Sequence, residues 1–463
     1  MNILVICYVY PLEPAPAGVM VRDLAEDFAS AGHDVTVLTG WPNHPKGVLY
    51  PGFQARWRHT ERDGRHRVVR VAHAICPKSS ALARLWVYFT FAVSSLLNGL
   101  VLGRQDVVVS LSTPLLGVWT AWALARLWRG RFVNVIFDLW PEAIHNAGLV
   151  RRRHPLYRLA RWLDTRNCLW SDKITTLGRG MRDQITERGI DPQHVQVIPF
   201  WIDTDMIRPM PRDNAWRREQ GIPPETFVAL FAGTIGYASG AQMLVRTAET
   251  LADRHDILLL IVGEGVAKDE LQRLAAGRGV RNLKFLPFQP AERLAEMQSA
   301  ADVGLVTLLP KSGSTSVPSK VLGYMAAGRA VLASATEDSD TARLIRQAEC
   351  GLTVPAQDGA ALAGAIISLA DDHPRAEALG RRAREYAVEH FSRGAVVGMY
   401  RRVILGKACA RAGPGTVPEA PAGRRQTADD VVRLSAADRA EFENRPGSAY
   451  TYIKGDNDGQ AYQ

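Results

Sequence analysis

Short apolar segments alternate with longer amphipathic segments along most of the chain. The short segments end at Gly, Pro, Asn or Asp, as buried strands do, and the longer ones carry apolar residues at helical spacing. The predicted strands cover residues 2–8, 35–39, 68–72, 106–110, 132–137, 173–177, 195–199, 227–234, 257–263, 284–287, 301–309 and 330–334. Because strands that alternate with helices form parallel sheets covered on both faces, we predict an α/β protein with two doubly wound, Rossmann-like domains.

The length of 463 residues also favours two domains, since one hydrophobic core rarely grows so large. The strand series restarts after a Pro- and Asp-rich joint near residues 200–212, and a long helix is predicted from about 384 to 404. The predicted divisions are residues 1–205, 206–385, a C-terminal helical segment 386–409, and a tail 410–463 that we expect to be mostly disordered. An Ala-, Pro- and Gly-rich linker covers residues 409–423.

Composition is that of a soluble globular protein, with 47% hydrophobic and 22% charged residues. The five cysteines are scattered and form no C-x-x-C pair, so they indicate neither a disulfide framework nor a zinc site. Met1 leads directly into an apolar segment that we interpret as a buried strand rather than as a secretion signal. We therefore expect a cytoplasmic location.

The positive charge is uneven, because residues 1–205 hold 24 Lys and Arg against 17 Asp and Glu. Many of these arginines alternate with Trp, Tyr and Leu, a pattern that suits the headgroup layer of an anionic membrane. An ordinary solvated surface is the main alternative. Nucleic acid is disfavoured, since no helix-turn-helix, zinc-finger or RNP pattern accompanies the charge.

Residues 86–103 contain no charged side chain, which brings this segment to the lower limit for crossing a bilayer. Ser94, Ser95 and Asn98 interrupt its apolar character, and a predicted strand follows at once. We interpret the segment as a buried or membrane-grazing helix rather than a membrane span.

The segment from Pro310 to Gly328 is a hydroxyl-rich loop followed by an apolar helix that opens at Pro318. The N–H groups of the first helical turn, the helix dipole, the Ser319 hydroxyl and Lys320 would meet at one place, and this arrangement suits a diphosphate. The alternative is an ordinary capped surface helix. Backbone N–H groups of Gly233, Thr234 and Gly236, at a predicted strand end, would add donors, and Gly18 and its loop would do the same from the opposite wall.

Several motifs together resemble one family, the GT-B glycosyltransferases of family 4, over about residues 1–405. In the first half they are A-G-H-D-V-T-V-L-T-G-W-P-N-H-P-K-G (31–47), Y-P-G-F (50–53) and F-D-L-W-P-E-A-I-H-N-A-G-L (137–149); in the second half they are F-A-G-T-I-G (231–236), V-G-E-G (262–265), V-P-S-K (317–320) and A-A-G-R-A-V-L-A-S (326–334). The segment 137–149 resembles in particular the branch of O-antigen N-acetyl-fucosamine transferases.

This resemblance implies two domains facing across a cleft, a nucleotide-sugar donor on the second, an acceptor on the first, and retention of anomeric configuration. It also implies that the C-terminal helix packs back on the first domain. The residues expected to hold the donor nucleoside or sugar are Gly263, Glu264, Pro287, Phe288, Thr315 and Ser316. Many members carry two glutamates eight positions apart, and those positions here are Thr315 and Gly323.

Asp138 and Glu142 are the candidate catalytic carboxylates, because the acceptor hydroxyl needs a base and the reacting sugar tolerates a neighbouring carboxylate. Their alternative roles are those of a helix cap and its first-turn partner. His44 and His145 are candidates on the acceptor side. The D-x-D sequence 203–205 stands in a linker context, and we expect no catalytic metal and no cofactor.

The expected function is therefore a retaining glycosyltransferase that uses a nucleoside diphosphate donor, with UDP favoured by the resemblance. Its partners would be a lipid-linked saccharide and an anionic membrane, at the cytoplasmic face, in cell-surface polysaccharide or lipopolysaccharide synthesis. A UDP-sugar 2-epimerase and a catalytically silent binding homologue are the alternatives. A Rossmann dehydrogenase is disfavoured, because the first strand is not followed by G-x-G-x-x-G.

Overall fold

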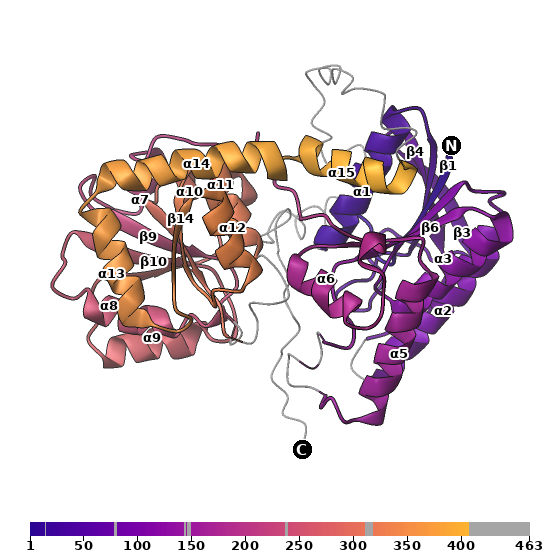
Figure 1. The fold of residues 1–463 in the computed structure, drawn as a ribbon, viewed down its shortest axis with the longest axis horizontal. Coiled ribbons are helices and arrows are strands. Elements are labelled where there is room, and N and C mark those ends of the chain that lie inside the picture. Colours follow the sequence, from indigo (N-terminus) through magenta and orange to yellow (C-terminus); the bar gives the residue numbers. More distant parts are fainter. Residues whose placement is uncertain are drawn as a thin grey trace. The chain divides into compact units, whose positions relative to one another are not determined.

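The computed structural model describes residues 1–13, 15–77, 81–142, 145, 150–236, 239–310 and 318–406. The chain forms two compact units (Figure 1). The first contains residues 1–175, 188–196 and the described residues from 397 onward; the second contains residues 176–187 and 197–396. The C-terminal tail 410–463, which we expect to be mostly disordered, lies outside the described residues.

The first sheet has eight strands in the order β3-β4-β2-β1-β5-β6-β7-β8. Its strands are β1 (Asn2–Ile6), β2 (Asp34–Gly40), β3 (Arg58–Asp63), β4 (His66–Val71), β5 (Val107–Leu111), β6 (Arg131–Ile136), β7 (Lys173–Thr176) and β8 (Val195–Val197). Strands β4, β2, β1, β5 and β6 pair in parallel, and β3 pairs antiparallel with β4 at the edge. The strand order reverses between β1 and β5, which makes their carboxyl ends a topological switch point.

The helices between β1 and β8 are α1 (Pro16–Ser30), α2 (Ala81–Leu100), α3 (Leu115–Trp128), α5 (Pro155–Trp170) and α6 (Arg179–Thr186), with a short 3-10 helix, η1 (Pro192–His194). Helices α2 and α3 bury Phe91 and Leu124 against one face of the sheet, beside Ile6 and Val108. This core positions the loops that leave the carboxyl ends of β1 and β6.

The second sheet has six strands in the order β11-β10-β9-β12-β13-β14. They are β9 (Phe227–Ala232), β10 (Ile257–Val262), β11 (Leu283–Leu286), β12 (Val303–Thr307), β13 (Ala330–Ser334) and β14 (Gly351–Val354), all paired in parallel. Here the order reverses between β9 and β12, so a second switch point lies at the carboxyl ends of these two strands.

The helices after β8 are α7 (Ala215–Glu219), α8 (Met243–Thr250), α9 (Lys268–Gly277), α10 (Leu294–Ser299), α11 (Ser319–Ala326), α12 (Asp340–Ala348), α13 (Gly359–Ala370), α14 (His373–Phe391) and α15 (Arg393–Leu405), with η3 (Ala291–Arg293). Successive residues of β9 enter two cores: Leu230 packs with Tyr324 on one face, and Phe231 packs with Leu244 on the other. This burial on both faces is why the strand is continuously apolar.

The predicted fold class, two parallel-sheet α/β domains, is confirmed, and each predicted strand overlaps an observed one. Strands β3 and β14 were not predicted. Strand β3 was missed because its charged residues alternate with no apolar face, which is typical of a protected sheet edge. The single helix predicted over 384–404 is wrong: the chain is extended at Ser392, where a bridge to Ile202 separates α14 from α15.

Candidate functional site

The switch point of the second sheet brings together the segments that sequence reasoning assigned to a diphosphate. The chain leaves β9 through Gly233, leaves β12 through Leu308, and enters α11 at Ser319. Strands β9 and β12 are neighbours, so these segments share one edge of the sheet. Residues 311–317 lie outside the described residues, including the predicted site residues Thr315 and Ser316.

Lys320 lies over an aromatic ring at this edge. Its Nζ is 3.7 Å from the centroid of the Phe231 ring, a cation–π distance. In the described part of the chain no carboxylate pairs with Lys320, and desolvation alone lowers its pKa to about 7. The Lys320 side chain is half-buried at this edge. An anion would restore the charged form.

The start of α11 lacks a side-chain cap. Pro318 occupies the N-cap position, and its side chain makes no capping hydrogen bond to the first turn. Serine, threonine or aspartate normally fills this role, so the alternative of an ordinary capped surface helix is disfavoured. The start of a helix without a side-chain cap and a lysine in its first turn are both features that favour an anion.

Two glycines pack the loops after β9 and β10 against each other. Gly263 has φ +157°, and a Cβ built on it would lie 1.9 Å from the carbonyl oxygen of Gly233. Only glycine fits there. The Gly233 N–H donates to the carbonyl of Val262 at 2.9 Å, so it is not free for a phosphate. The predicted role of Gly233 as a phosphate donor is therefore corrected to one of backbone packing.

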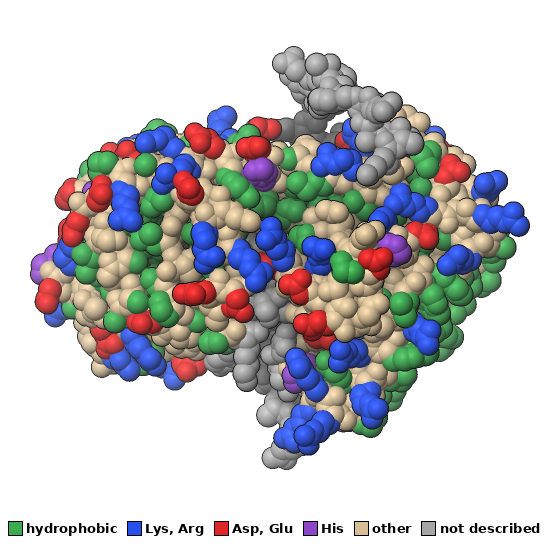
Figure 2. Space-filling view, in the orientation of Figure 1, with side chains coloured by type: hydrophobic (Ala, Val, Ile, Leu, Met, Phe, Trp, Pro, Cys, Tyr) green, Lys and Arg blue, Asp and Glu red, His purple; other side chains and the backbone are tan. Residues whose placement is uncertain are grey.

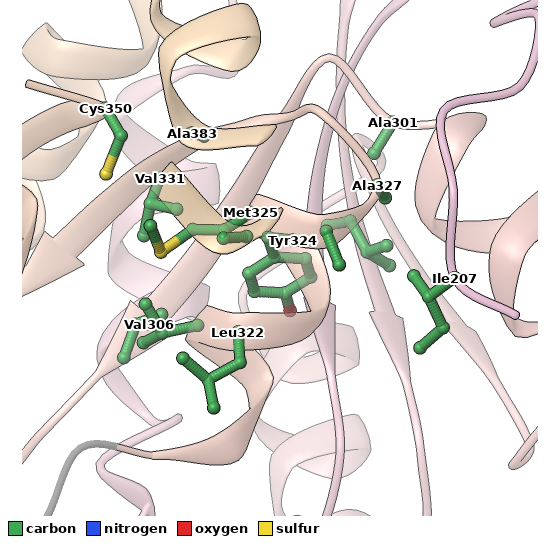
Figure 3. Packing of buried hydrophobic residues seen from close by; sticks show 14 of the residues in the cluster. Ile207, Ala301, Val306, Leu322, Tyr324, Met325, Ala327, Val331, Cys350 and Ala383 are labelled. Atoms are coloured by element: carbon green, nitrogen blue, oxygen red, sulfur yellow. The ribbon is translucent and has the colours of Figure 1, made fainter. Parts of the chain in front are cut away.

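Tyr324 of α11 packs against the end of β9 at this edge of the sheet. Its buried hydroxyl accepts a hydrogen bond from the N–H of Ala232 at 2.8 Å. Its ring packs directly on Gly304, where a Cβ would lie only 2.2 Å from Cγ of the ring. Figure 3 shows the ring packed among apolar residues that include Leu322 and Met325. This contact fixes the start of α11 relative to the end of β9. Sequence reasoning missed both Tyr324 and Gly304, because neither stands in a recognisable motif.

The residues assigned to the donor nucleoside follow the neighbouring strands. Glu264, after β10, forms an ion pair with Lys268 at 2.6 Å, and Thr234 leaves the end of β9. Pro287 and Phe288 follow β11 with exposed side chains. These positions share the carboxyl edge of the sheet with Lys320, and an exposed Phe ring offers a stacking surface for a base.

Gly323 packs closely against a buried side chain of a neighbouring helix. A Cβ there would lie 2.7 Å from Nε2 of Gln298, which is buried beside α11. The Gln298 side chain therefore fills the space into which a residue at 323 would extend. Its Oε1 has no hydrogen-bond partner within the described ranges.

The loop after β1 is organised around a buried carboxylate. Glu13 accepts hydrogen bonds from the backbone N–H groups of Tyr10, Asn43 and His44, at 3.2, 2.9 and 2.8 Å. Burial raises its pKa, and these three bonds oppose that rise. The backbone of His44, the acceptor-side candidate, is therefore fixed by its hydrogen bond to Glu13. Sequence reasoning missed Glu13, an isolated carboxylate in a loop.

Gly18 belongs to the first turn of α1. Its N–H donates to the carbonyl of Ala15, and a Cβ there would lie 3.1 Å from Cα of Tyr10. The predicted donation to a phosphate is corrected, because this glycine serves the close approach of α1 to the loop after β1.

The two candidate catalytic carboxylates have different surroundings. Asp138 follows β6 and is exposed. Desolvation by nearby protein atoms raises the pKa of its carboxyl group. Glu142 is buried in an ion pair with Arg188 at 2.8 Å, and Arg188 also bonds Asp164 at 2.6 Å. A carboxylate held in this way stabilises the fold and is poorly placed to accept a proton. The catalytic assignment of Glu142 is corrected on this geometry.

Two further predicted features have local structural roles. His145 lies 2.9 Å from the carbonyl oxygen of Val150 through Nδ1, and its ring meets Tyr157 edge-on. Asp203, in the D-x-D sequence, accepts the N–H groups of Asp205 and Met206, as a turn-capping residue does. In the described ranges, His, Cys, Asp and Glu nowhere gather as a metal site.

Two α/β units, each built on a mainly parallel sheet, are the architecture of the GT-B fold. Family models of the glycosyl transferase 4-like domain and of glycosyl transferases group 1 match residues 17–201 and 212–386, respectively. The chain therefore belongs to these GT-B glycosyltransferases.

Among relatives, the chain is 27% identical to WcaI of Escherichia coli K12, named as a colanic acid biosynthesis glycosyl transferase, over 71% of this chain and 82% of WcaI. It is 26% identical to WbjE of Pseudomonas aeruginosa, named as a glycosyltransferase, over 63% and 72% of the two chains. The structure of Anabaena HepE in complex with UDP and glucose has the same fold, with a TM-score of 0.61 and 16% identity over 88% and 99% of the two chains.

Proposed function

We propose that the protein transfers a sugar, with retention of anomeric configuration, from a nucleoside diphosphate donor to a lipid-linked saccharide. The donor is UDP-linked, as the bound UDP of HepE and the branch resemblance support. The names of the relatives support a role in cell-surface polysaccharide or O-antigen synthesis. The enzyme would act at the cytoplasmic face of an anionic membrane, which the excess of arginine in the first half favours.

The observation that carries this proposal is Lys320, which pairs with no carboxylate of the described residues, in the first turn of a helix whose N-cap is Pro318. A leaving nucleoside diphosphate gains negative charge as the sugar–phosphate bond breaks. Donors already held in place stabilise that charge without further reorganisation. In this proposal Lys320 and Ser319 contact the diphosphate, and Glu264 and Phe288 contact the nucleoside.

Asp138 is the proposed residue that contacts the acceptor hydroxyl. Its exposed carboxylate has no ion-pair or hydrogen-bond partner within the described ranges, and its raised pKa makes it a better base than an ordinary aspartate. It would accept the hydroxyl proton as the new glycosidic bond forms. His44 stays a predicted neighbour of the acceptor.

Thermal unfolding with and without nucleotides tests the proposal. UDP, GDP, dTDP and NAD would each be added to the wild type, to Lys320→Ala and to the control Lys284→Ala. Lys284 lies in β11 and donates to the carbonyl of Gln220, away from α11. A ligand that binds only the folded state raises the melting temperature according to its concentration over its dissociation constant. We expect UDP to stabilise the wild type and the control by several degrees, and the Lys320→Ala variant by less than one.

The other outcomes separate the alternatives. A shift with no nucleotide would favour a catalytically silent homologue, consistent with Gly323 in place of a glutamate. A shift with UDP together with acceptor-free conversion of UDP-N-acetylglucosamine would favour a 2-epimerase. A shift with NAD alone would overturn the whole assignment.

A further inference from the structure

Helix α2 exposes the side that its sequence makes most apolar. Seven large apolar side chains on it are between 41% and 79% exposed: Leu82, Leu85, Trp86, Phe89, Val93, Leu97 and Leu100. At about 100° per residue they fall within an arc of about 120°. They therefore form one continuous stripe, here called the α2 outer face, along a helix about 30 Å long.

The opposite side of α2 is partly polar although it is buried. Ser94, Ser95 and Asn98 are 3% exposed or less, and Asn98 donates to the carbonyl of Ser94 at 3.0 Å. Close packing on α3 explains the small residues, since a Cβ on Gly99 would lie 2.4 Å from Leu124. A helix that faced water would show the reverse distribution, with polar residues outside.

Helix α5 lies on the other side of α3 and adds positive charge. Its exposed residues alternate between large apolar and basic: Leu156, Arg158, Leu159, Arg161, Trp162, Arg166 and Leu169. The guanidinium of Arg166 lies 5.4 Å from the centroid of the Trp162 ring. Helix α3 contacts both α2 and α5, and Figure 2 shows hydrophobic side chains gathered with Lys and Arg along the edge where these helices lie.

Acidic residues are nearly missing from this surface. Helices α2 and α3 contain no Asp or Glu, and the one acidic residue of α5, Asp164, is buried in its ion pair with Arg188. A second copy of the chain on this face would bring arginine against arginine without a carboxylate to pair them. An anionic lipid surface supplies both the acyl layer and the negative charge.

We propose that α2 lies flat in an anionic bilayer, with its outer face among the first acyl carbons and the α5 arginines on lipid phosphates. None of the helices formed by the described residues combines the length and the apolarity that crossing a bilayer takes. Insertion in the membrane plane accounts for an apolar stripe on a helix whose other side is packed in a protein core. This inference rests on the proposed function for its purpose, since an enzyme on the bilayer reaches a lipid-linked acceptor.

Sedimentation with vesicles tests the inference. The full chain would be mixed with vesicles of phosphatidylglycerol and phosphatidylcholine, or of phosphatidylcholine alone. Variant one is Leu85→Ser with Phe89→Ser; variant two is Arg158→Gln with Arg161→Gln; the matched control is Val388→Ser, an exposed valine of α14. All five positions are exposed, so we expect each variant to fold.

The inference expects tight binding of the wild type and the control to anionic vesicles. Variant one should lose at least about tenfold in affinity at any salt concentration, because it removes inserted apolar surface. Variant two should lose about fivefold in vesicle affinity for each arginine replaced. This loss should occur only on anionic vesicles and mainly at low salt. Quenching of tryptophan fluorescence by brominated lipid should fall in Trp86→Phe.

Equal vesicle binding by the wild type and variant one would overturn the inference. So would a wild-type dimer, measured by light scattering in the absence of lipid, that variant one converts to a monomer. The UDP stabilisation of each variant is recorded in parallel. Vesicle binding without a UDP shift would overturn the proposed donor while supporting membrane binding by the α2 outer face. A UDP shift without vesicle binding would support the proposed donor and overturn membrane binding by that face.

Discussion

The switch points of the two sheets differ in whether a carboxylate of the described residues lies at them. In the first unit, the loop after β1 surrounds the chain's own carboxylate, Glu13, which accepts three backbone N–H groups. In the second, the start of α11 and Lys320 have no carboxylate partner among the described residues. Two sheets with the same kind of crossing thus differ: one loop holds an internal carboxylate, whereas the other edge carries a lysine that no carboxylate of the described residues pairs with. A fold-level resemblance between the units therefore says little about which one binds a diphosphate.

The largest expected effect concerns Asp138, the exposed carboxylate of the first unit. Asp138→Asn should lower kcat by about 100-fold or more, because it removes the proposed base, while UDP stabilisation stays unchanged. Since its pKa is raised and a base acts when deprotonated, wild-type kcat should fall as pH drops through that pKa, and the variant should lack this acidic limb. The measurement is kcat against pH at saturating donor.

Glu142→Gln provides the contrast for that variant. It breaks a buried ion pair with Arg188, so it should lower the free energy of unfolding by about 3 kcal/mol. Its folded fraction should keep most of the wild-type kcat. A variant that folds normally and has lost kcat would restore Glu142 as a catalytic residue.

The next effect concerns the glycine packing of the second unit. Gly263→Ala should lower the free energy of unfolding by about 3 kcal/mol, because its Cβ meets the Gly233 carbonyl and its φ is positive. Chemical denaturation measures the loss, and UDP stabilisation should disappear with it. Gly277→Ala in α9 is the matched control, since nothing lies within 4 Å of its Cβ; it should be neutral or slightly stabilising.

The internal anion of the first unit gives the third test. Glu13→Gln keeps the shape of the side chain but weakens its bonds to the three N–H groups, so we expect a loss of about 2 kcal/mol in unfolding free energy. UDP stabilisation should persist, because the donor is proposed to bind the second unit. Glu225→Gln, at an exposed glutamate, should change stability by less than about 0.5 kcal/mol. Loss of UDP binding in Glu13→Gln would show that the first unit also holds the donor.

The smallest expected effect is the pH dependence of donor binding. The pKa of Lys320 is lowered to about 7 without ligand, and a bound diphosphate would raise it. Protonation is then linked to binding, so affinity for UDP should fall several-fold as pH rises from 7 to 9. The lysine is half-buried, so solvent reduces the size of this change. Lys320→Arg stays charged and should show a flatter profile by calorimetry; the same slope in both proteins would exclude Lys320 as the titrating group.

Local sequence was enough to predict most of the fold. Buried parallel strands are continuous apolar runs, so β1, β9 and β13 are visible without knowledge of their neighbours. Strand β3 has charged residues at four of its six positions, and it forms by pairing with β4 at the edge of the sheet. The break at Ser392 depends likewise on pairing with Ile202, far away in the sequence.

Where one segment carries the chemistry, as at Lys320 and Ser319, the sequence alone is enough to make the prediction, and it stays a prediction. Where a distant partner decides the role of a residue, the sequence alone could not show it. The segment around Glu142 predicts a catalytic residue, but the carboxylate of Glu142 forms an ion pair with Arg188, which is 46 residues later in the chain. Glu13 carries no motif, and its role depends on N–H groups near Asn43. The packing of Gly263 on Gly233 requires the register of β9 with β10.

The exposed leucines of α2 also set the conditions under which the purified protein can be handled. Without lipid, its arginine-rich neighbours repel one another and keep copies apart at low ionic strength. Raising salt from 0.1 M to 1 M shortens the screening length from about 10 Å to about 3 Å, and apolar faces then associate. Salt should therefore release the protein from vesicles and promote its aggregation at the same time. A mild detergent at low salt is the suitable buffer for crystallisation or kinetic work.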